Sequence, residues 1–335
     1  MTAPLLQNLD QLPEALSRRG LDPRGHEELL ARMHDYFDRY ADLERRLLGE
    51  VWVSYPAHLF AEPIPEDPME AGEVLARRER ARLRLGDGES GDLMALLDRE
   101  GLKVYRPQFP EGTPLEGIFL FDAEAGPILV VDGRLTPLEA DFVFARLYAH
   151  YLVDNDPYVI HLLVRGAEAS AQDLRAQSFA AAFLVPAEGL AAYFEALKWV
   201  PGTALDAPTA LQLAAYFEVG YRTLLARLLT LNLVQPDEIP PLLIVLEAGG
   251  EPDAGGRERN AISERFLRLA LEAHARKFLD DRALAETLET DRPTARRLAG
   301  RFRVSEEAEA GAPEARPGGA SRPRAHTARK GRPKP

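Results

Sequence analysis

The sequence predicts an α+β protein with a small β-sheet, flanked by helical segments and followed by a disordered C-terminal tail. Two changes of hydrophobic period carry this prediction. Apolar residues recur at three- and four-residue steps over residues 1–50 and 69–99, as on the buried face of helices. Two apolar runs, 117–121 and 127–131, then follow each other across a short turn, which favours a β-hairpin. Helical spacing returns from Pro137 onward.

Residues 1–68 are predicted as an N-terminal helical segment that ends in a proline-rich linker. In the helical part, Leu29, Met33, Tyr36 and Tyr40 follow the spacing of one helix face. The stretch Tyr55–Pro68 contains four prolines, which are poor helix formers and typical of a connection.

Residues 69–248 are predicted as the central domain. After the two helices within 69–99, Leu102–Tyr105 reads as a short strand and is followed by the hairpin. A helix is expected over Pro137–Val153, with proline at an early position, and a second helix over Ala169–Leu184. Residues 240–246, a continuous apolar run, are predicted as one more strand.

A pair of helices is expected over residues 208–233, on either side of Val219-Gly220, with helix-turn-helix-like spacing. Its second helix offers Arg222, Thr223 and Arg227 as polar side chains. Two arginines favour a hairpin packed on the central domain over a helix that reads DNA.

The rest of the chain is predicted as a glycine-rich linker over 249–256, a helical unit over 257–304 and a disordered tail over 305–335. The net charge is −12, but residues from Ala315 onward contribute seven basic side chains and no acidic one, so the rest carries −19. An acidic body with a short basic tail excludes a globular domain that binds nucleic acid through overall charge.

The composition also limits the environment. The chain contains no cysteine, which excludes disulfides and thiolate metal sites and is compatible with a reducing compartment. No apolar stretch reaches 18 residues, and the first residues lack the pattern of a signal peptide. We therefore expect a cytoplasmic protein that does not span a membrane.

Two central segments carry a resemblance to a known family. The first is Glu139-Ala-Asp-Phe-Val-Phe-Ala-Arg-Leu-Tyr-Ala-His150, and the second is Arg175-Ala-Gln-Ser-Phe-Ala-Ala-Ala-Phe-Leu-Val-Pro186. With the preceding hairpin they resemble the ImmA/IrrE family of metallopeptidase-like proteins, over about residues 75–235. The resemblance implies a zincin-like core in which one helix reads His-Glu-x-x-His and a second helix supplies a Glu ligand.

The metal-binding positions of that family are replaced in this sequence. A zincin helix needs two imidazoles one turn apart and a carboxylate between them as general base. Arg146 stands at the first histidine, Leu147 at the general base and Arg175 at the third ligand, and only His150 is retained. A guanidinium stays protonated and cannot bind a metal. The sequence therefore predicts a degenerate active-site pocket without catalytic residues, metal or other cofactor.

Three fates of this pocket remain open. An internal ion pair from Glu139 or Asp173 to an arginine could plug it. Arg146, Arg175 and His150 could instead bind an anion, because paired arginines suit carboxylates and phosphates.

A metal site with shifted ligands is the third fate. It would use His150 and Asp154, approached by His161, Glu168 or Asp173. Asp154 is expected about 80° around the helix from position 146, which would turn such a site away from the old pocket.

A contact with DNA is expected, if anywhere, near the C-terminus. Arg292, Arg296, Arg297 and Arg301 cluster after Thr290 or Asp291, either of which could cap a helix. An exposed helical face is the competing interpretation.

The leading hypothesis is a non-catalytic regulatory protein that binds a protein partner, such as a transcription regulator. The resemblance implies this because family members act on repressors in stress and DNA-damage responses. A zinc metallopeptidase with shifted ligands and a DNA-binding transcription regulator using residues 281–335 are the alternatives.

Overall fold

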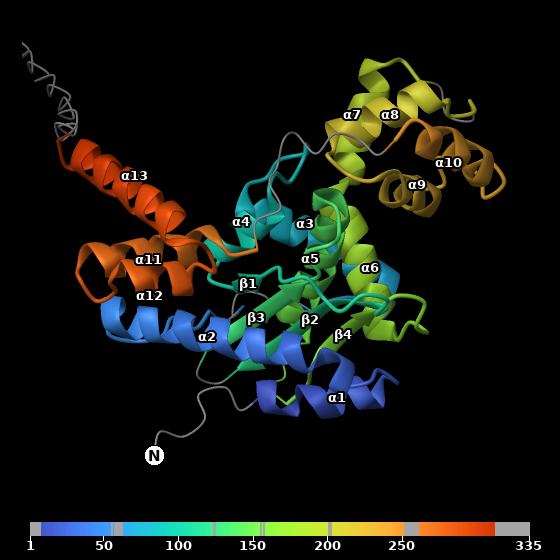
Figure 1. The fold of residues 1–335 in the computed structure, drawn as a ribbon. Coiled ribbons are helices and arrows are strands. Elements are labelled where there is room, and N and C mark those ends of the chain that lie inside the picture. Colours follow the sequence, from blue (N-terminus) through green and yellow to red (C-terminus); the bar gives the residue numbers. More distant parts are fainter. Residues whose placement is uncertain are drawn as a thin grey trace, which may run out of the picture.

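The computed structural model describes residues 8–54, 56, 63–122, 125–154, 156, 158–199, 203–250 and 261–311, with side chains up to Arg303. The described elements surround one four-stranded sheet (Figure 1). In chain order they are α1 (Leu12–Arg18), α2 (Glu27–Leu48), α3 (Pro68–Leu83), α4 (Leu93–Arg99), β1 (Lys103–Tyr105), β2 (Leu115–Asp122), β3 (Gly126–Val131), α5 (Pro137–Val153), β4 (His161–Val164), α6 (Ala171–Leu184), α7 (Ala187–Ala196), α8 (Ala207–Tyr216), α9 (Tyr221–Thr230), α10 (Ile239–Ala248), α11 (Glu264–Ala275), α12 (Asp281–Thr287) and α13 (Arg292–Gly311).

The sheet has the order β1-β3-β2-β4. Strands β2 and β3 form the predicted antiparallel hairpin, with Ile118 opposite Val130 and Leu120 opposite Ile128. Strand β1 pairs with β3 in parallel, and β4 pairs with β2 antiparallel. The mixed α+β character predicted from the sequence is confirmed.

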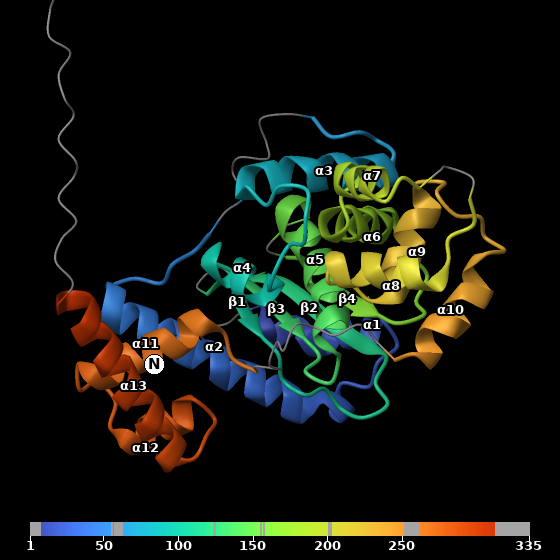
Figure 2. The same cartoon turned by 90° about the horizontal axis from the view of Figure 1, so that it is seen from above.

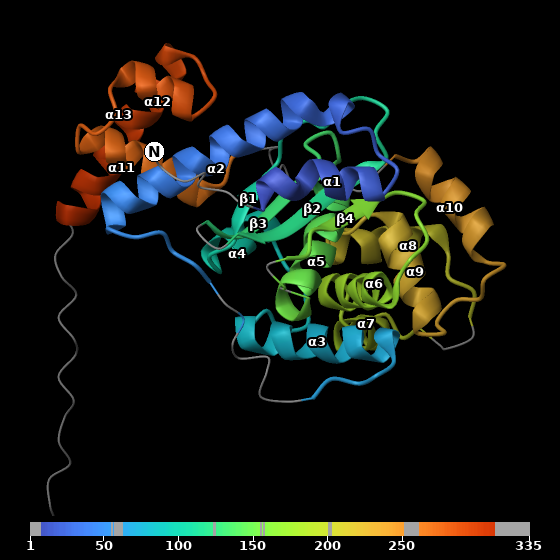
Figure 3. The ribbon, with the colours of Figure 1, turned by 90° about the horizontal axis from the view of Figure 1, so that it is seen from below.

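Both faces of the sheet are covered, as the side-chain alternation of strands requires. Phe119, Leu129 and Leu163 face a core that also contains the apolar residues of α3 to α9. Their neighbours Ile118 and Val130 face a second core, built with α1, α2 and α11 to α13. Figure 3 shows α1 and α2 on one side of the strands and α5, α6 and α3 on the other.

Local capping fixes the first turns of the two central helices. Thr136 and Glu139 form a reciprocal capping box at the start of α5, and Ser170 and Asp173 form another at α6. Each box satisfies backbone N–H groups that have no partner within the first helical turn. The start of α6, which carries Arg175, is therefore well defined, and so is the start of α5, whose later turns carry Arg146 and His150.

Two glycines allow close approach of helices to their neighbours. A Cβ at Gly72 of α3 would lie 2.6 Å from the Arg175 carbonyl oxygen and 2.6 Å from the Phe179 nitrogen of α6. A Cβ at Gly117 of β2 would lie 2.8 Å from Val143 of α5. No other residue type fits these contacts without moving a helix, so the glycines set how tightly α3, α6, α5 and the sheet pack.

The C-terminal helices α11 to α13 dock on α2 at one end of the molecule, whereas α8 to α10 lie at the opposite end (Figure 2). Phe266 of α11 packs against Tyr36 and Tyr40 of α2. Beneath it, the fully buried pair Lys103–Glu44 has an N–O distance of 3.1 Å, and Arg265 binds the other Glu44 oxygen at 2.6 Å. A buried polar cluster therefore joins α2, β1 and α11.

Three predictions about elements need correction. Residues 240–246 form helix α10, not a strand: a short apolar run does not distinguish the two, and Pro240 and Pro241 are tolerated in a first helical turn, where no N–H donor is needed. The apolar stretch at residues 161–164 is strand β4, which was not predicted. The tail was expected to be disordered from residue 305, but α13 continues to Gly311.

Some predicted segments lie outside the described residues. They are half of the proline-rich linker, most of the glycine-rich linker and residues 312–335 with the basic side chains. Within the described part, no single helix has the length and apolar composition needed to cross a membrane. One bent helix pair, 171–184 with 187–197, meets the two criteria of length and composition together.

Candidate functional site

Helices α5 and α6 bring the predicted pocket residues to one region. Arg146, Leu147 and His150 come from α5, and Arg175 comes from α6, which packs beside it. The structure places them in three different environments: a buried ionic cluster, the apolar core and the edge of a small cleft.

A buried ionic cluster, here called the Asp154 cluster, consists of His150, Asp154, His161 and Arg175. Nδ1 of His150 lies 3.0 Å from one carboxylate oxygen of Asp154, and an Arg175 N–H donates to the other at 2.5 Å. The side chains of His150, Asp154 and Arg175 are 1%, 8% and 17% exposed. The carboxylate is thus bound on both oxygens by groups that the protein itself supplies.

The two histidines of the cluster stack, with ring centroids 4.2 Å apart. Nε2 of His161 lies 3.1 Å from the backbone oxygen of Asp154. Burial, together with the nearby His150, lowers the pKa of His161 to about 4. Burial alone would raise the pKa of Asp154, but the hydrogen bonds from His150 and Arg175 lower it below its ordinary value. At neutral pH the cluster therefore holds an ionised Asp154 beside a neutral His161.

Asp173 of α6 completes the surroundings of His150. One of its oxygens lies 3.9 Å from Nε2 of His150, and that buried nitrogen has no hydrogen-bond partner among the described residues. Burial raises the pKa of Asp173, but hydrogen bonds from Ser170 and the charges of His150 and Arg146 lower it overall. Asp173 therefore adds a negative charge between α5 and α6.

Leu147 lies in the apolar core and is fully buried. A Cβ built on Gly117 of β2 would come within 3.1 Å of the Leu147 side chain, so this side chain packs directly over the sheet. It has no polar atom and cannot transfer a proton.

Arg146 faces a cleft of about 230 Å³ beside the cluster. Burial lowers its pKa, whereas Glu116 and Asp173 raise it, and its Nε has no hydrogen-bond partner among the described residues. The cleft is lined by three basic and three acidic side chains: Arg19, Arg146, Arg165, Glu116, Glu168 and Asp173. Such a lining is electrically balanced rather than strongly positive.

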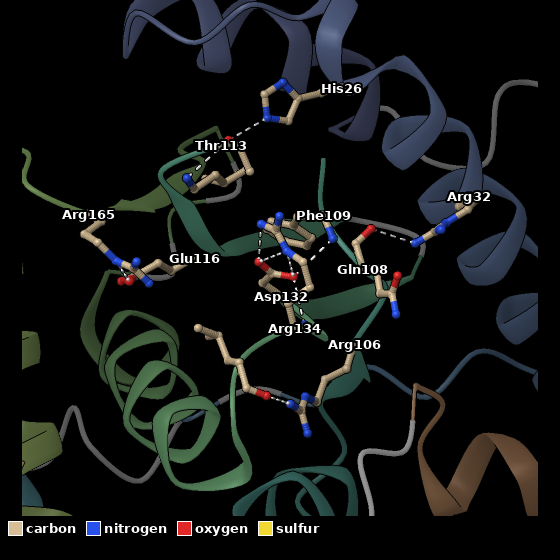
Figure 4. Close-up of polar contacts among 12 residues, drawn as sticks. His26, Arg32, Arg106, Gln108, Phe109, Thr113, Glu116, Asp132, Arg134 and Arg165 are labelled. Carbon is tan, nitrogen blue, oxygen red and sulfur yellow. Dashed lines mark hydrogen bonds and ion pairs between the residues drawn. The ribbon is translucent and has the colours of Figure 1, made fainter. Parts of the chain in front are cut away.

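The rim of this cleft is held by side-chain contacts (Figure 4). Arg165 donates to Glu116 at 2.7 Å, which removes part of the charge of both groups from the cleft. Nearby, Asp132 accepts from the Phe109 backbone at 3.1 Å and from Arg134 at 2.6 Å. These bonds hold the loops that lead into β2 and α5.

One segment of the chain, which contains α5 and α6, matches a known protein family. Residues 98–229 match the family model described as the IrrE N-terminal-like domain of the Peptidase_M78 family. This part of the chain is similar to the IrrE N-terminal-like domain. The match confirms the resemblance to ImmA/IrrE-type, metallopeptidase-like proteins for the segment that contains α5 and α6. A search among curated proteins gives no match to the chain.

The residues of this matched segment do not fit the zinc ion of a metallopeptidase. Arg146 and Arg175 place guanidinium groups where ligands are needed, and these groups have no lone pair to offer. Within the described ranges, no group of three or more histidine, aspartate or glutamate side chains is arranged to hold a metal ion. Asp154, the best remaining carboxylate, is engaged by Arg175 and His150.

The predicted ion-pair partners need correction. Glu139 accepts the Thr136 backbone N–H of its own capping box at 2.8 Å, and the arginine of α6 pairs with Asp154 instead. Asp154 is the residue after α5, with φ −120°, so it no longer follows the helical phase from which its direction was predicted. Its side chain therefore reaches the old pocket. The approach of His161 and Asp173 to His150, predicted for a shifted site, is seen, whereas Glu168 lies on the neighbouring cleft.

The two other predicted regions differ in how many arginines they expose: Arg222 of α9 is exposed and paired with Glu247. In α9, Arg227 is buried and donates to the Val185 carbonyl oxygen at 2.9 Å and to Glu73 at 3.0 Å, so it points into the protein. The four arginines predicted for a DNA contact all lie exposed on α13: Arg292, Arg296, Arg297 and Arg301. Asp291, one of the two predicted caps, accepts the Thr294 N–H at 2.7 Å.

Proposed function

We propose that this chain is a non-catalytic ImmA/IrrE-like protein that acts in the cytoplasm by binding a protein partner, in the control of transcription or of a stress or DNA-damage response. The observation that carries the proposal is the buried Arg175–Asp154 ion pair. Arg175 occupies the position at which the resemblance implies the third metal ligand, and it binds the carboxylate of Asp154, which would otherwise be available to a metal.

The replacement of the general base supports the same proposal. Peptide hydrolysis by a zincin requires a metal-activated water and a carboxylate to accept its proton. At that place Leu147 is fully buried against the sheet. The scaffold then serves to present surfaces rather than to cleave a peptide.

An exposed apolar surface on α10 supports the interaction part of the proposal. Ile244 is 69% exposed and Val245 is 58% exposed, although both belong to an apolar helix. Exposed aliphatic side chains of this kind are typical of surfaces that a partner covers.

Metal analysis of the purified full-length chain tests the proposal. We expect no stoichiometric zinc after purification or after incubation with zinc, and no cleavage of a denatured protein substrate. The matched positive control is the triple variant Arg146→His, Leu147→Glu, Arg175→Glu, which rebuilds the family's donor set and should bind zinc. Stoichiometric zinc in the natural chain that is lost in His150→Ala would refute the proposal.

The second candidate, a metallopeptidase with shifted ligands, draws on the closeness of His150, His161 and Asp173. For such a site to form, Arg175 would have to leave Asp154. Under that candidate Arg175→Ala should increase zinc affinity, whereas under the leading proposal it should only destabilise the fold. The same metal analysis therefore separates the two.

A further inference from the structure

Helices α12 and α13 form a helix-turn-helix at one edge of the molecule. They are joined by the four residues Leu288–Asp291, within the usual length of this motif. Glu289 in this turn has φ 49°, the left-handed conformation that reverses the chain, and the Thr290 N–H donates to the Ala285 oxygen at 3.0 Å. The turn is thus a defined structure and not a loose connection.

The packing of the unit decides which face of α13 is presented. Ala295 and Ala299 are buried in the second core, together with Leu284 and Leu288 of the preceding helix and turn. All four arginines identified above are exposed: by helical phase, Arg297 and Arg301 lie on the face opposite these alanines, and Arg292 and Arg296 flank the buried face. Because the small buried residues hold α13 close to α11 and α12, those arginines have a fixed orientation.

The charge of this face is strongly positive in a chain of net charge −12. Residues 292–303 contain five arginines and no acidic residue, and the acidic residues of α13 all follow Arg303. Residues 261–303 as a whole contain ten basic and seven acidic residues, a net charge of +3. The basic part is thus the N-terminal half of the helix, which in such motifs meets the bases.

A groove of about 720 Å³ continues this basic surface towards the start of α12. Its basic lining residues are His274, Lys277, Arg282, Arg292, Arg296 and Arg303, and its acidic ones are Asp280 and Asp281. Arg296 and His274 both bind Asp281, at 2.6 and 2.9 Å, so that carboxylate is largely neutralised. The groove therefore favours an anionic partner.

The pair α8–α9 provides an internal comparison. It has the same shape, with Glu218 of its turn at φ 52°. When the two pairs are aligned on their left-handed turn residues, Arg227 of α9 occupies the position of Leu298 in α13. Arg227 is buried. Helix α9 is therefore a packing element, and shape alone does not distinguish the two pairs. The number of exposed arginines distinguishes them: α9 has one, Arg222, which is paired with Glu247, whereas α13 has the four identified above.

We propose that α13 binds duplex DNA by entering the major groove with its N-terminal half, Arg292 to Arg301. The major groove, about 12 Å wide, accepts an α-helix, and arginine forms paired hydrogen bonds with guanine or binds phosphate. This inference does not depend on the state of the old zinc pocket, because α13 lies at the far end of the second core.

Fluorescence anisotropy with a labelled 24-base-pair duplex of mixed sequence tests the inference on the full-length chain. The variant is Arg292→Ala, Arg297→Ala, Arg301→Ala, which leaves the Arg296–Asp281 pair intact. We expect about 100-fold weaker binding at low salt. The slope of log affinity against log salt concentration should become less steep by up to about 3.

The matched control is Arg18→Ala, Arg46→Ala, Arg222→Ala, which removes the same charge from exposed arginines elsewhere. It should bind DNA within about threefold of the natural chain, since overall charge contributes weakly at a distance. Glutamine in place of alanine at the three α13 positions provides a second variant if thermal unfolding shows a loss of fold. The inference is overturned if the natural chain does not bind the duplex, if the α13 variants bind it equally well, or if the control loses as much affinity.

Discussion

Acidification below pH 6.5 should weaken the fold through His161, and replacement of this residue by glutamine should remove that effect. His161 is 8% exposed and its pKa is lowered to about 4, mainly by burial and next by the charge of His150. In the unfolded chain the imidazole takes up a proton near pH 6.5. Between these two values the unfolded chain binds one more proton than the folded chain, so falling pH favours unfolding.

The size of the effect follows from the gap between pKa 6.5 and about 4. Each pH unit in that interval costs about 1.4 kcal/mol of unfolding free energy. The contribution of His161 is fully present above pH 6.5, declines as the pH falls and reaches its limit below about pH 4. Between pH 7 and pH 4.5 we expect a loss of about 2.5 kcal/mol. Asp154 and Asp173 have lowered pKa values, so their losses fall below this window.

Urea unfolding at pH 7.0, 6.0, 5.0 and 4.5 measures this loss for the natural chain and for His161→Gln. Glutamine keeps a donor for the Asp154 backbone oxygen but does not titrate. The difference in unfolding free energy between the two proteins should shift by about 2.5 kcal/mol across the series. His34→Gln, at a partly exposed histidine of α2, controls for loss of an imidazole elsewhere. A difference that stays constant with pH would refute the reasoning.

Three further predictions concern packing and buried charge, each measured by urea unfolding at pH 7. Asp154→Asn leaves the buried guanidinium of Arg175 without its carboxylate and should cost about 3 kcal/mol; a loss below about 0.5 kcal/mol would contradict the cluster's importance. Gly72→Ala forces α3 away from α6 and should cost more than about 2 kcal/mol. The control Gly300→Ala, on an open helix face, should be neutral or slightly stabilising. Equal effects of the two changes would contradict the close approach of α3 to α6. Glu44→Gln removes the carboxylate that both Lys103 and Arg265 bind and should cost about 3 kcal/mol, and partial restoration by Lys103→Met in the double variant would identify the unpaired lysine as one cause.

The fold could be predicted where the sequence carries a clear period or a turn signal. The hairpin of β2 and β3 and the long helix α5 have both, since apolar runs flank a short turn and Thr136-Pro137 marks a helix start. Residues 240–246 carry neither, because seven apolar residues in a row fit a buried strand as well as a helix. In the structure this segment packs on one side only, with Leu246 buried and Ile244 exposed. Residues two apart face opposite sides of a helix, but the same side of a strand.

For the candidate site, the sequence allowed a prediction of which residues are replaced, but not of which side chains these residues contact. Arg146, Leu147 and Arg175 follow from the resemblance and from helix spacing. The role of Asp154 does not, because it is the first residue after α5 and its direction depends on a backbone conformation that spacing cannot supply. The stacking of His161 on His150 depends in turn on β4, a strand of four residues that is too short to show a clear period of its own.

The second core contains residues from both ends of the described chain, which limits where the protein can be cut into fragments that fold. Residues 98–229 match the family, yet Ile118, Ile128 and Val130 of that segment are buried by α2 and α11, which lie outside it on either side in sequence. A fragment cut at the family boundaries would carry an uncovered apolar sheet face and should aggregate. We therefore expect the smallest unit that folds as a whole to extend from the first helices to α13, well beyond the segment that matches the family.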